Sequence, residues 1–167
     1  MNTIGYLCVI YSVETHDLDP AAADRVRALA ARLDEILRAR DAVRGGALAD
    51  RFILSSEQPA TVQITAFVDQ HVKAFGLRYV SWFDTGSRDN EATVGHAIGE
   101  VGQLCRMQPN ALPIAVVGSN IIGYHVVAGF AAQLGLPIDR VESPENGFGW
   151  CGHMHLVDFA AKSVVFV

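Results

Sequence analysis

Apolar, strand-like runs and helix-like stretches alternate along this chain, and the alternation restricts its fold more than any other feature. The first apolar run covers residues 4–10, and the helical stretch after it opens at Asp19-Pro20, a capping residue followed by a proline suited to the first helical position. Similar units follow along the chain. Because helices link parallel strands and cover both faces of the sheet that they form, this order predicts a parallel sheet between two helical layers.

The remaining elements follow from apolar periodicity and from turn residues. Strands are expected at 4–10, 51–54, 77–83 and 113–117, and helices at about 20–40, 59–75, 91–107 and 121–134. The last part differs, since strand-forming residues at 148–159 and 163–167 predict a hairpin. We therefore expect one α/β domain over residues 1–167, with three α/β/α layers and a mainly parallel sheet containing one antiparallel strand.

Composition narrows the classes of function. The chain has 167 residues, 50% apolar and 19% charged, which suits a single core of ordinary size. A net charge of -5 disfavours nucleic acid and anionic lipid as partners, and no apolar run approaches the roughly 20 residues needed to span a bilayer. Cys8, Cys105 and Cys151 are odd in number and widely spaced, as expected for reduced core thiols. We expect a cytoplasmic protein.

The segment after the first strand carries a family resemblance. Residues 11–15 are Tyr-Ser-Val-Glu-Thr, and in this layout the chain resembles the histidine phosphatase superfamily, also called the phosphoglycerate mutase-like fold, in its short form. That family has Arg-His-Gly-Glu-Thr at this point. Only Glu14 and Thr15 match, since Tyr11 replaces the arginine that binds phosphate and Ser12 replaces the histidine that becomes phosphorylated.

Further motifs extend the resemblance over nearly the whole chain. Leu-Asp-Pro at 18–20 corresponds to the family's Leu-Thr-Pro, and Ser55-Ser56 corresponds to its Ser-Ser-Pro. Ala60 stands where the family has its second phosphate-binding arginine. Ser119, after Val117-Gly118, stands where the family has its second histidine. The resemblance thus implies the phosphatase scaffold with two arginines and two histidines replaced.

These replacements bear directly on function. A phosphoryl group is bound by charged, preferably bidentate donors, which tyrosine and alanine do not supply. Ser12 also lacks the nucleophilicity of an imidazole unless a base activates it. We therefore expect a pseudophosphatase without a cofactor or metal, acting in binding or interaction through the former phosphate cleft. The alternative is an enzyme of altered chemistry, such as a hydrolase that uses Ser12 with Glu14 or His125 as helper.

The candidate cleft lies where the predicted parallel strands end, the usual ligand position in such sheets. Its residues are Tyr11, Ser12, Glu14, Thr15, Ala60, Ser119 and Asn120. A small polar ligand or a protein is the expected partner, and Arg51 or Arg88 is the substitute cation if phosphate does bind. The competing interpretation is that these are ordinary turn and capping residues.

Three other features allow different interpretations. Gly118 to Gly123 follows a strand as a phosphate loop does, but the segment lacks the lysine of such a loop. His153 and His155 alternate in the predicted tail strand and could bind a metal with a third ligand from elsewhere in the chain. The candidates for this third ligand are His125, His96 and Cys151. The apolar tail 164–167 is expected to form either a covered sheet edge or a homodimer contact.

Overall fold

The computed structural model describes residues 6–12, 17–43, 50–74, 76–80, 91–107, 111–118, 120–136 and 150–167. Strands and helices follow one another in the predicted order. They are β1 (Tyr6–Tyr11), α1 (Pro20–Val43), β2 (Asp50–Ser55), α2 (Pro59–Val72), β3 (Gly76–Tyr79), α3 (Glu91–Met107), β4 (Ala111–Val117), α4 (Asn120–Gln133), β5 (Met154–Asp158) and β6 (Ser163–Phe166). No helix among the described residues is long and apolar enough to cross a membrane.

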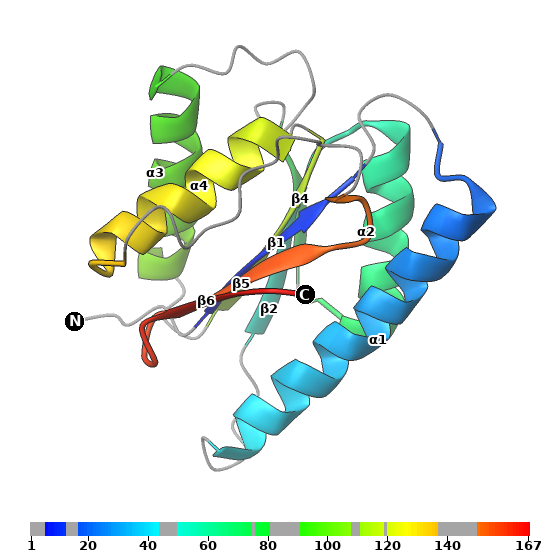
Figure 1. Ribbon diagram of the computed structural model, residues 1–167, viewed down its shortest axis with the longest axis horizontal. Helices are drawn as coiled ribbons and strands as arrows, with labels where there is room; N and C mark the ends of the chain where they lie inside the picture. The colour runs from blue at the N-terminus through cyan, green and yellow to red at the C-terminus, as the bar shows by residue number, and fades with distance from the viewer. Residues whose placement is uncertain are drawn as a thin grey trace.

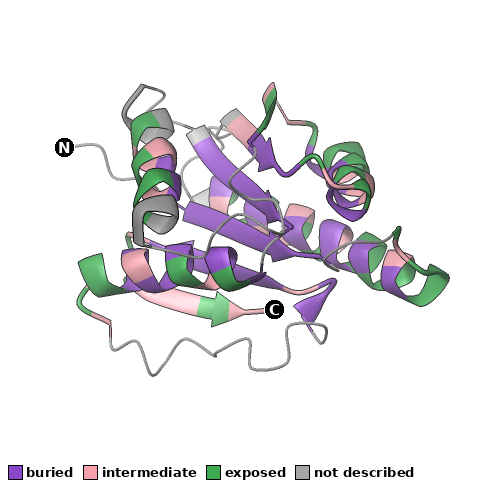
Figure 2. Cartoon of the chain, turned by 90° about the horizontal axis from the view of Figure 1, so that it is seen from above, coloured by how far each residue is buried: buried purple, intermediate pink, exposed green. Residues whose placement is uncertain are grey.

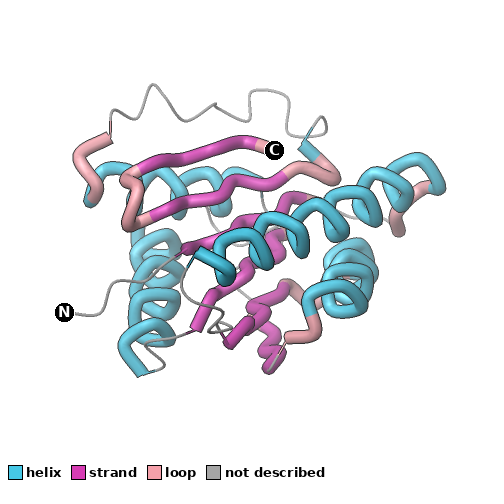
Figure 3. Tube along the Cα trace, turned by 90° about the horizontal axis from the view of Figure 1, so that it is seen from below, coloured by secondary structure: helices cyan, strands magenta, loops and turns pink. Residues whose placement is uncertain are grey.

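The strands form one mixed sheet in the order β3-β2-β4-β1-β5-β6 (Figures 1 and 3). β1, β2, β3 and β4 run parallel to one another, and β5 is antiparallel to both β1 and β6. This arrangement confirms the predicted mainly parallel sheet with one antiparallel strand. It also brings the carboxyl ends of β1, β2 and β4 to the same edge.

Two helical layers cover the sheet, with α1 and α2 on one face and α3 and α4 on the other (Figure 1). β1 shows how the core divides, because successive side chains of a strand point to opposite faces. One core contains Tyr6, Cys8 and Ile10 with side chains of α1 and α2, and the other contains Leu7, Val9 and Tyr11 with side chains of α3 and α4. The central strands are accordingly buried (Figure 2).

Local chemistry fixes the helix ends near the site. The Asp19 carboxylate accepts a hydrogen bond from the Ala22 N–H at 2.7 Å, which caps α1 ahead of its first-turn proline, as the sequence predicts. α2 likewise begins at a proline. It ends three residues earlier than expected because Lys73 adopts a left-handed conformation, with a φ of 52°.

The tail strand is shorter than the 148–159 segment predicted for it. β5 begins at Met154, because Trp150 to His153 form a turn in which the His153 N–H donates to the Trp150 carbonyl at 2.9 Å. Gly152 has a φ of 82°, which favours glycine, and a Cβ there would lie 2.9 Å from Cβ of Arg25. This turn therefore fits closely against α1.

Candidate functional site

The strand ends bring part of the predicted cleft together. Tyr11 is paired with Val117 in the parallel β1–β4 ladder, and the Ser56 N–H, just after β2, donates to the Val116 carbonyl at 3.0 Å. Ser12 follows β1 directly, and Ala60 and Asn120 lie in the first turns of α2 and α4, the helices that follow β2 and β4. Tyr11, Ser12, Ala60 and Asn120 thus lie at the carboxyl edge of the sheet, and the cleft that they were expected to form stays a prediction. Glu14, Thr15 and Ser119 lie outside the described residues.

Ser12, which the sequence resemblance aligns with the family's nucleophile, is fully buried. Its hydroxyl donates a hydrogen bond to the Val117 carbonyl at 3.1 Å, across 105 residues of chain. This hydrogen bond has a structural role, because it links the end of β1 to the end of β4.

Ala60, which the sequence resemblance aligns with the second arginine, is buried in the first turn of α2. Hydroxyl groups fasten this turn to β2. Thr61 donates to the Ser56 carbonyl at 2.8 Å, and Thr65 donates to Oγ of Ser55 at 2.9 Å. The first turn of α2 is therefore packed tightly against β2, and the methyl group of Ala60 lies in this contact.

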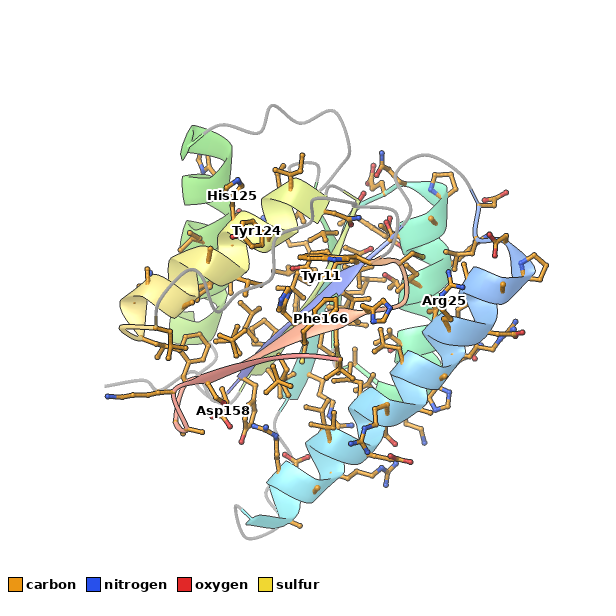
Figure 4. All side chains as sticks on the ribbon, in the orientation of Figure 1. Tyr11, Arg25, Tyr124, His125, Asp158 and Phe166 are labelled. Atoms are coloured by element: carbon orange, nitrogen blue, oxygen red, sulfur yellow. The ribbon has the colours of Figure 1, made fainter. Side chains whose placement is uncertain are left out.

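Tyr11, which the sequence resemblance aligns with the first arginine, points into the core on the α4 side and is fully buried (Figure 4). Its hydroxyl oxygen lies 2.7 Å from Nδ1 of His155 in β5, at hydrogen-bond distance. Its ring meets Trp150 edge-on, with 4.7 Å between ring centroids, and meets His155 in the same way at 5.4 Å. Such edge-to-face contacts are favourable for aromatic rings.

α4 is adapted to the Tyr11 ring. A Cβ on Gly123 would lie 2.9 Å from Cε1 of Tyr11 and 2.7 Å from Cγ2 of Val117. Only a residue without a side chain therefore fits at this point of the helix. Gly123, which was considered as part of a phosphate loop, instead leaves space for the Tyr11 ring to pack against α4.

The Tyr11–His155 pair is neutral at pH 7. Burial raises the pKa of Tyr11 well above its usual value, and the nearby Tyr124 adds to the rise. Burial also lowers the pKa of His155 to about 4. The hydrogen bond therefore joins an uncharged hydroxyl to an uncharged imidazole.

Sequence reasoning missed the aromatic residues that enclose this pair. Trp150 lies against His155, with 5.3 Å between ring centroids, and Phe166 of β6 lies 4.8 Å from His155 and 5.1 Å from Trp150. Tyr124 of α4 completes the group, 6.4 Å from Trp150. The aromatic content of the tail was the only available signal, and it did not indicate contact with β1.

The histidines considered as metal ligands have other contacts. His155 is bonded to Tyr11, and His153 stacks on Phe166 while its Nδ1 lies 3.2 Å from the Val167 carbonyl oxygen. The residues that the structure describes contain no group of three side chains that could hold a metal ion. Cys8 and Cys151 are buried free thiols, and burial raises the pKa of Cys8 to about 12.

Arg51 does not lie at the candidate cleft, which corrects its proposed role as a substitute cation. It lies near the amino end of β2, whereas Ser55 lies at the carboxyl end of the same strand, where the candidate cleft is expected. Its guanidinium is 3.2 Å from an Asp41 oxygen and 3.4 Å from an Asp34 oxygen, and it donates to the Val72 carbonyl at 3.0 Å. No local pattern around Arg51 indicates these carboxylates, because they come from α1. Arg88 lies outside the described residues.

Comparison with known proteins identifies the fold. No protein-family model matches the sequence, and no curated protein matches it. Among solved structures, the chain is similar to an Agrobacterium tumefaciens protein assigned as phosphohistidine phosphatase SixA, with a TM-score of 0.62 and 12% identity, covering 99% of this chain and 97% of that one. A protein of the same assignment from Nakamurella multipartitia gives a TM-score of 0.56 and 15% identity, covering 97% and 92%.

A mycobacterial glucosyl-3-phosphoglycerate phosphatase, solved in complex with VO3, is also similar, with a TM-score of 0.51 and 10% identity over 97% of this chain and 95% of that one. These similarities span nearly the full length of both chains in each case. The chain therefore has the histidine phosphatase fold, as the strand-end motifs imply.

Proposed function

We propose that this chain, a protein with the histidine phosphatase fold, is a pseudophosphatase that acts by binding or interaction through the former phosphate cleft. The observation that carries the proposal is the burial of Tyr11. A side chain that is hydrogen-bonded to His155 and packed under α4 is part of the core and leaves no cation in the arginine position.

Electrostatics supports the same conclusion. Phosphate binding depends on charge-assisted donors, and transfer of a phosphoryl group requires positive charge around the oxygens of the transition state. His155 is held neutral by burial, and Ala60 carries no donor in its side chain. The described part of the cleft thus lacks the charges on which this chemistry depends.

The hydrolase alternative has less support. A serine nucleophile needs a base that accepts its proton, and the Ser12 hydroxyl is directed at the Val117 carbonyl. This orientation agrees better with a structural role than with attack on a substrate. We therefore place the function of the cleft in binding.

The test is an assay of the full chain against an aryl phosphate and a protein phosphohistidine, beside an active phosphatase of this fold as positive control. We expect no turnover above the level of a Ser12→Ala variant. Vanadate should leave the melting temperature unchanged, because a ligand stabilises a protein only through its occupancy of the folded state. Turnover that Ser12→Ala abolishes would refute the proposal.

The binding role needs its own measurement. Isotope-labelled protein can be titrated with small polar ligands and with cell-extract fractions while backbone amide resonances are followed. We expect shifts centred on Ser56, Gly118 and Asn120, at the carboxyl edge. Responses confined to the opposite edge, around Arg51 and Asp158, would contradict the assignment of the cleft.

A further inference from the structure

A row of aromatic rings runs from the core to the surface of α4. The Tyr11 ring lies 4.7 Å from the Trp150 ring, and Trp150 lies 6.4 Å from Tyr124, measured between ring centroids. Tyr11 and Trp150 are buried, whereas Tyr124 is half-buried and is followed by the exposed His125. In Figure 4, Tyr124 and His125 lie on α4, on the side of the sheet to which Tyr11 points. Tyr124 is therefore the outer end of a continuous aromatic path.

The Tyr11 hydroxyl has a proton acceptor within reach at the inner end of this path. Its oxygen lies 2.7 Å from Nδ1 of His155, inside the range of about 2.6 to 3.2 Å over which side chains transfer a proton. The His155 imidazole is uncharged at pH 7, because burial lowers its pKa to about 4, and a neutral imidazole has one nitrogen that accepts a proton. Both side chains are buried, at 0% and 1% exposure. A proton that leaves the phenol therefore passes to this nitrogen rather than to water.

Such an acceptor matters most when the phenol loses an electron. A phenol that has lost an electron is a far stronger acid than an imidazolium, so its proton moves to His155 even though burial weakens that base. Without an acceptor the positive charge would stay on a buried ring, which is costly. The hydrogen bond therefore lowers the free energy that is needed to oxidise Tyr11.

Tyr6 and Tyr79 provide a contrast. Tyr6 belongs to the same strand as Tyr11 and is also buried, but the Arg40 guanidinium carbon lies 4.4 Å from the centre of its ring. A positive charge over the ring opposes the loss of an electron. Tyr79 of β3 is 42% exposed, so its hydroxyl group exchanges protons with solvent. Tyr11 differs from both because an uncharged base lies beside its hydroxyl group in the core.

We propose that the Tyr11–His155 pair is a proton-coupled redox site that gives one electron, by way of the aromatic path, to an oxidant at the surface of α4. The oxidant is a one-electron acceptor, such as a transition-metal complex or an oxygen-centred radical, and this electron reduces it. As the electron leaves, the phenolic O–H bond breaks and the proton bonds to Nδ1 of His155. A neutral phenoxyl radical then lies beside an imidazolium, and the charge of the protein has risen by one.

The surroundings of His155 make this step reversible. Its ring contacts the rings of Tyr11, Trp150 and Phe166, which carry no charge. An imidazolium among uncharged rings is costly to keep, so the oxidised pair readily regains an electron. A one-electron reductant such as ascorbate supplies the electron, and the proton returns from Nδ1 to the phenol. The site thus takes up oxidising equivalents from the surface without a lasting change in the protein.

Electron paramagnetic resonance tests the proposal. The full chain is mixed with hexachloroiridate(IV), which takes up one electron, and is frozen within milliseconds. We expect a tyrosyl radical signal that Tyr11→Phe abolishes and that ascorbate removes when it is added before freezing. The iridium complex should be reduced more slowly in heavy water than in ordinary water, because the proton moves with the electron. His155→Gln should lose most of the signal together with this isotope effect.

Two further tyrosines supply matched controls. Tyr6→Phe removes a buried phenol from the same strand, and Tyr79→Phe removes an exposed one. Both variants should keep the signal of the unmodified chain. Tyr124→Phe tests the path, and it should slow reduction of the iridium complex several-fold without changing the shape of the signal, since phenylalanine is oxidised far less readily than tyrosine. Circular dichroism verifies that each variant is folded.

Several results would overturn the proposal. These are the absence of a tyrosyl radical in the unmodified chain, an unchanged signal in Tyr11→Phe, loss of the signal in Tyr79→Phe, or equal rates in heavy and ordinary water. An unchanged rate in Tyr124→Phe would contradict the path through α4. None of these measurements involves phosphatase activity or binding at the cleft, so the redox site and the proposed function can fail independently.

Discussion

At the amino ends of the parallel strands this protein buries arginines beside carboxylates, whereas at the carboxyl ends it buries a tyrosine beside a histidine. Arg51 is largely buried between Asp34 and Asp41, and Arg40 pairs with Asp158 while lying 4.4 Å from the centre of the Tyr6 ring. At the other edge, Tyr11 and His155 are both uncharged. Buried polar side chains are thus compensated by ion pairs at one end of the sheet and by a hydrogen bond between uncharged groups at the other.

The difference shows under which conditions this fold buries a cation. The scaffold accepts a buried guanidinium when carboxylates neutralise it, whereas an arginine that binds phosphate must keep donors free for that ligand. Such a group is costly to bury until the ligand arrives. With Tyr11 in this position the carboxyl edge has a neutral, well-packed core, and under the proposed function it has no affinity for phosphate.

The strongest test of the comparison puts a cation into the neutral region. Tyr11→Arg would place a guanidinium between Trp150 and Gly123, with no described carboxylate among the residues that contact Tyr11. We expect a loss of about 4 kcal/mol or more in the free energy of unfolding, measured by urea denaturation. A stable Tyr11→Arg variant that binds vanadate would instead show that the pocket can be restored by a single change.

The converse test removes the cation from the charged region. Arg51→Ala leaves Asp34 and Asp41 without their shared partner, and we expect a loss of about 3 to 5 kcal/mol in the same measurement. Arg38→Ala is the control, because Arg38 pairs with the same Asp34 from an exposed position and should cost only a few tenths of a kcal/mol, on the order of a surface ion pair. Equal losses in the two variants would contradict the assigned role of Arg51.

Acid should destabilise the neutral region. The pKa of His155 is lowered to about 4 by burial, against about 6.5 in an unfolded chain. Between these values the unfolded chain binds a proton that the folded one does not, so stability falls as the pH falls through this window. We expect about 2 kcal/mol less stability at pH 5 than at pH 7 from this residue. His155→Gln should lose that part of the dependence, and an unchanged profile in the variant would locate it elsewhere.

The smallest expected effect comes from the hydroxyl of Tyr11. Tyr11→Phe keeps the ring in its seat against Gly123 but leaves Nδ1 of His155 without this partner, at a cost of about 1 to 2 kcal/mol. Denaturation at pH 7 gives the magnitude, and the nitrogen chemical shift of His155 should change with it. No change in either quantity would show that the hydrogen bond contributes nothing in solution.

The sequence predicted the order of elements well because each one depends on local patterns. The helix at α1 follows from its Asp19-Pro20 opening, and the helix at α3 was expected over the same residues that the structure assigns to it. The errors fall where backbone conformation ends an element. Lys73 shortens α2, and Gly152 delays the start of β5, although neither residue carried a distinct pattern.

The candidate site was predicted only in part, for a reason of geometry. Strand ends that converge can be inferred from the parallel order, and Tyr11, Ser12, Ala60 and Asn120 do belong to that edge. The direction of the Tyr11 side chain depends on partners far along the chain, Gly123 and His155, which no local pattern connects to it. Likewise, Arg51 was considered as a free cation because its carboxylate partners come from a different element.

The position of β5 in the sheet also has a consequence for biosynthesis. One long side of β1 is covered by β4, but the other is covered by β5, which lies more than 140 residues later in the sequence. At roughly 5–20 residues per second, a ribosome needs on the order of 10 s to make the intervening chain. Throughout that interval the nascent protein carries an apolar strand with an open flank, which makes it a natural client for chaperones that act during translation.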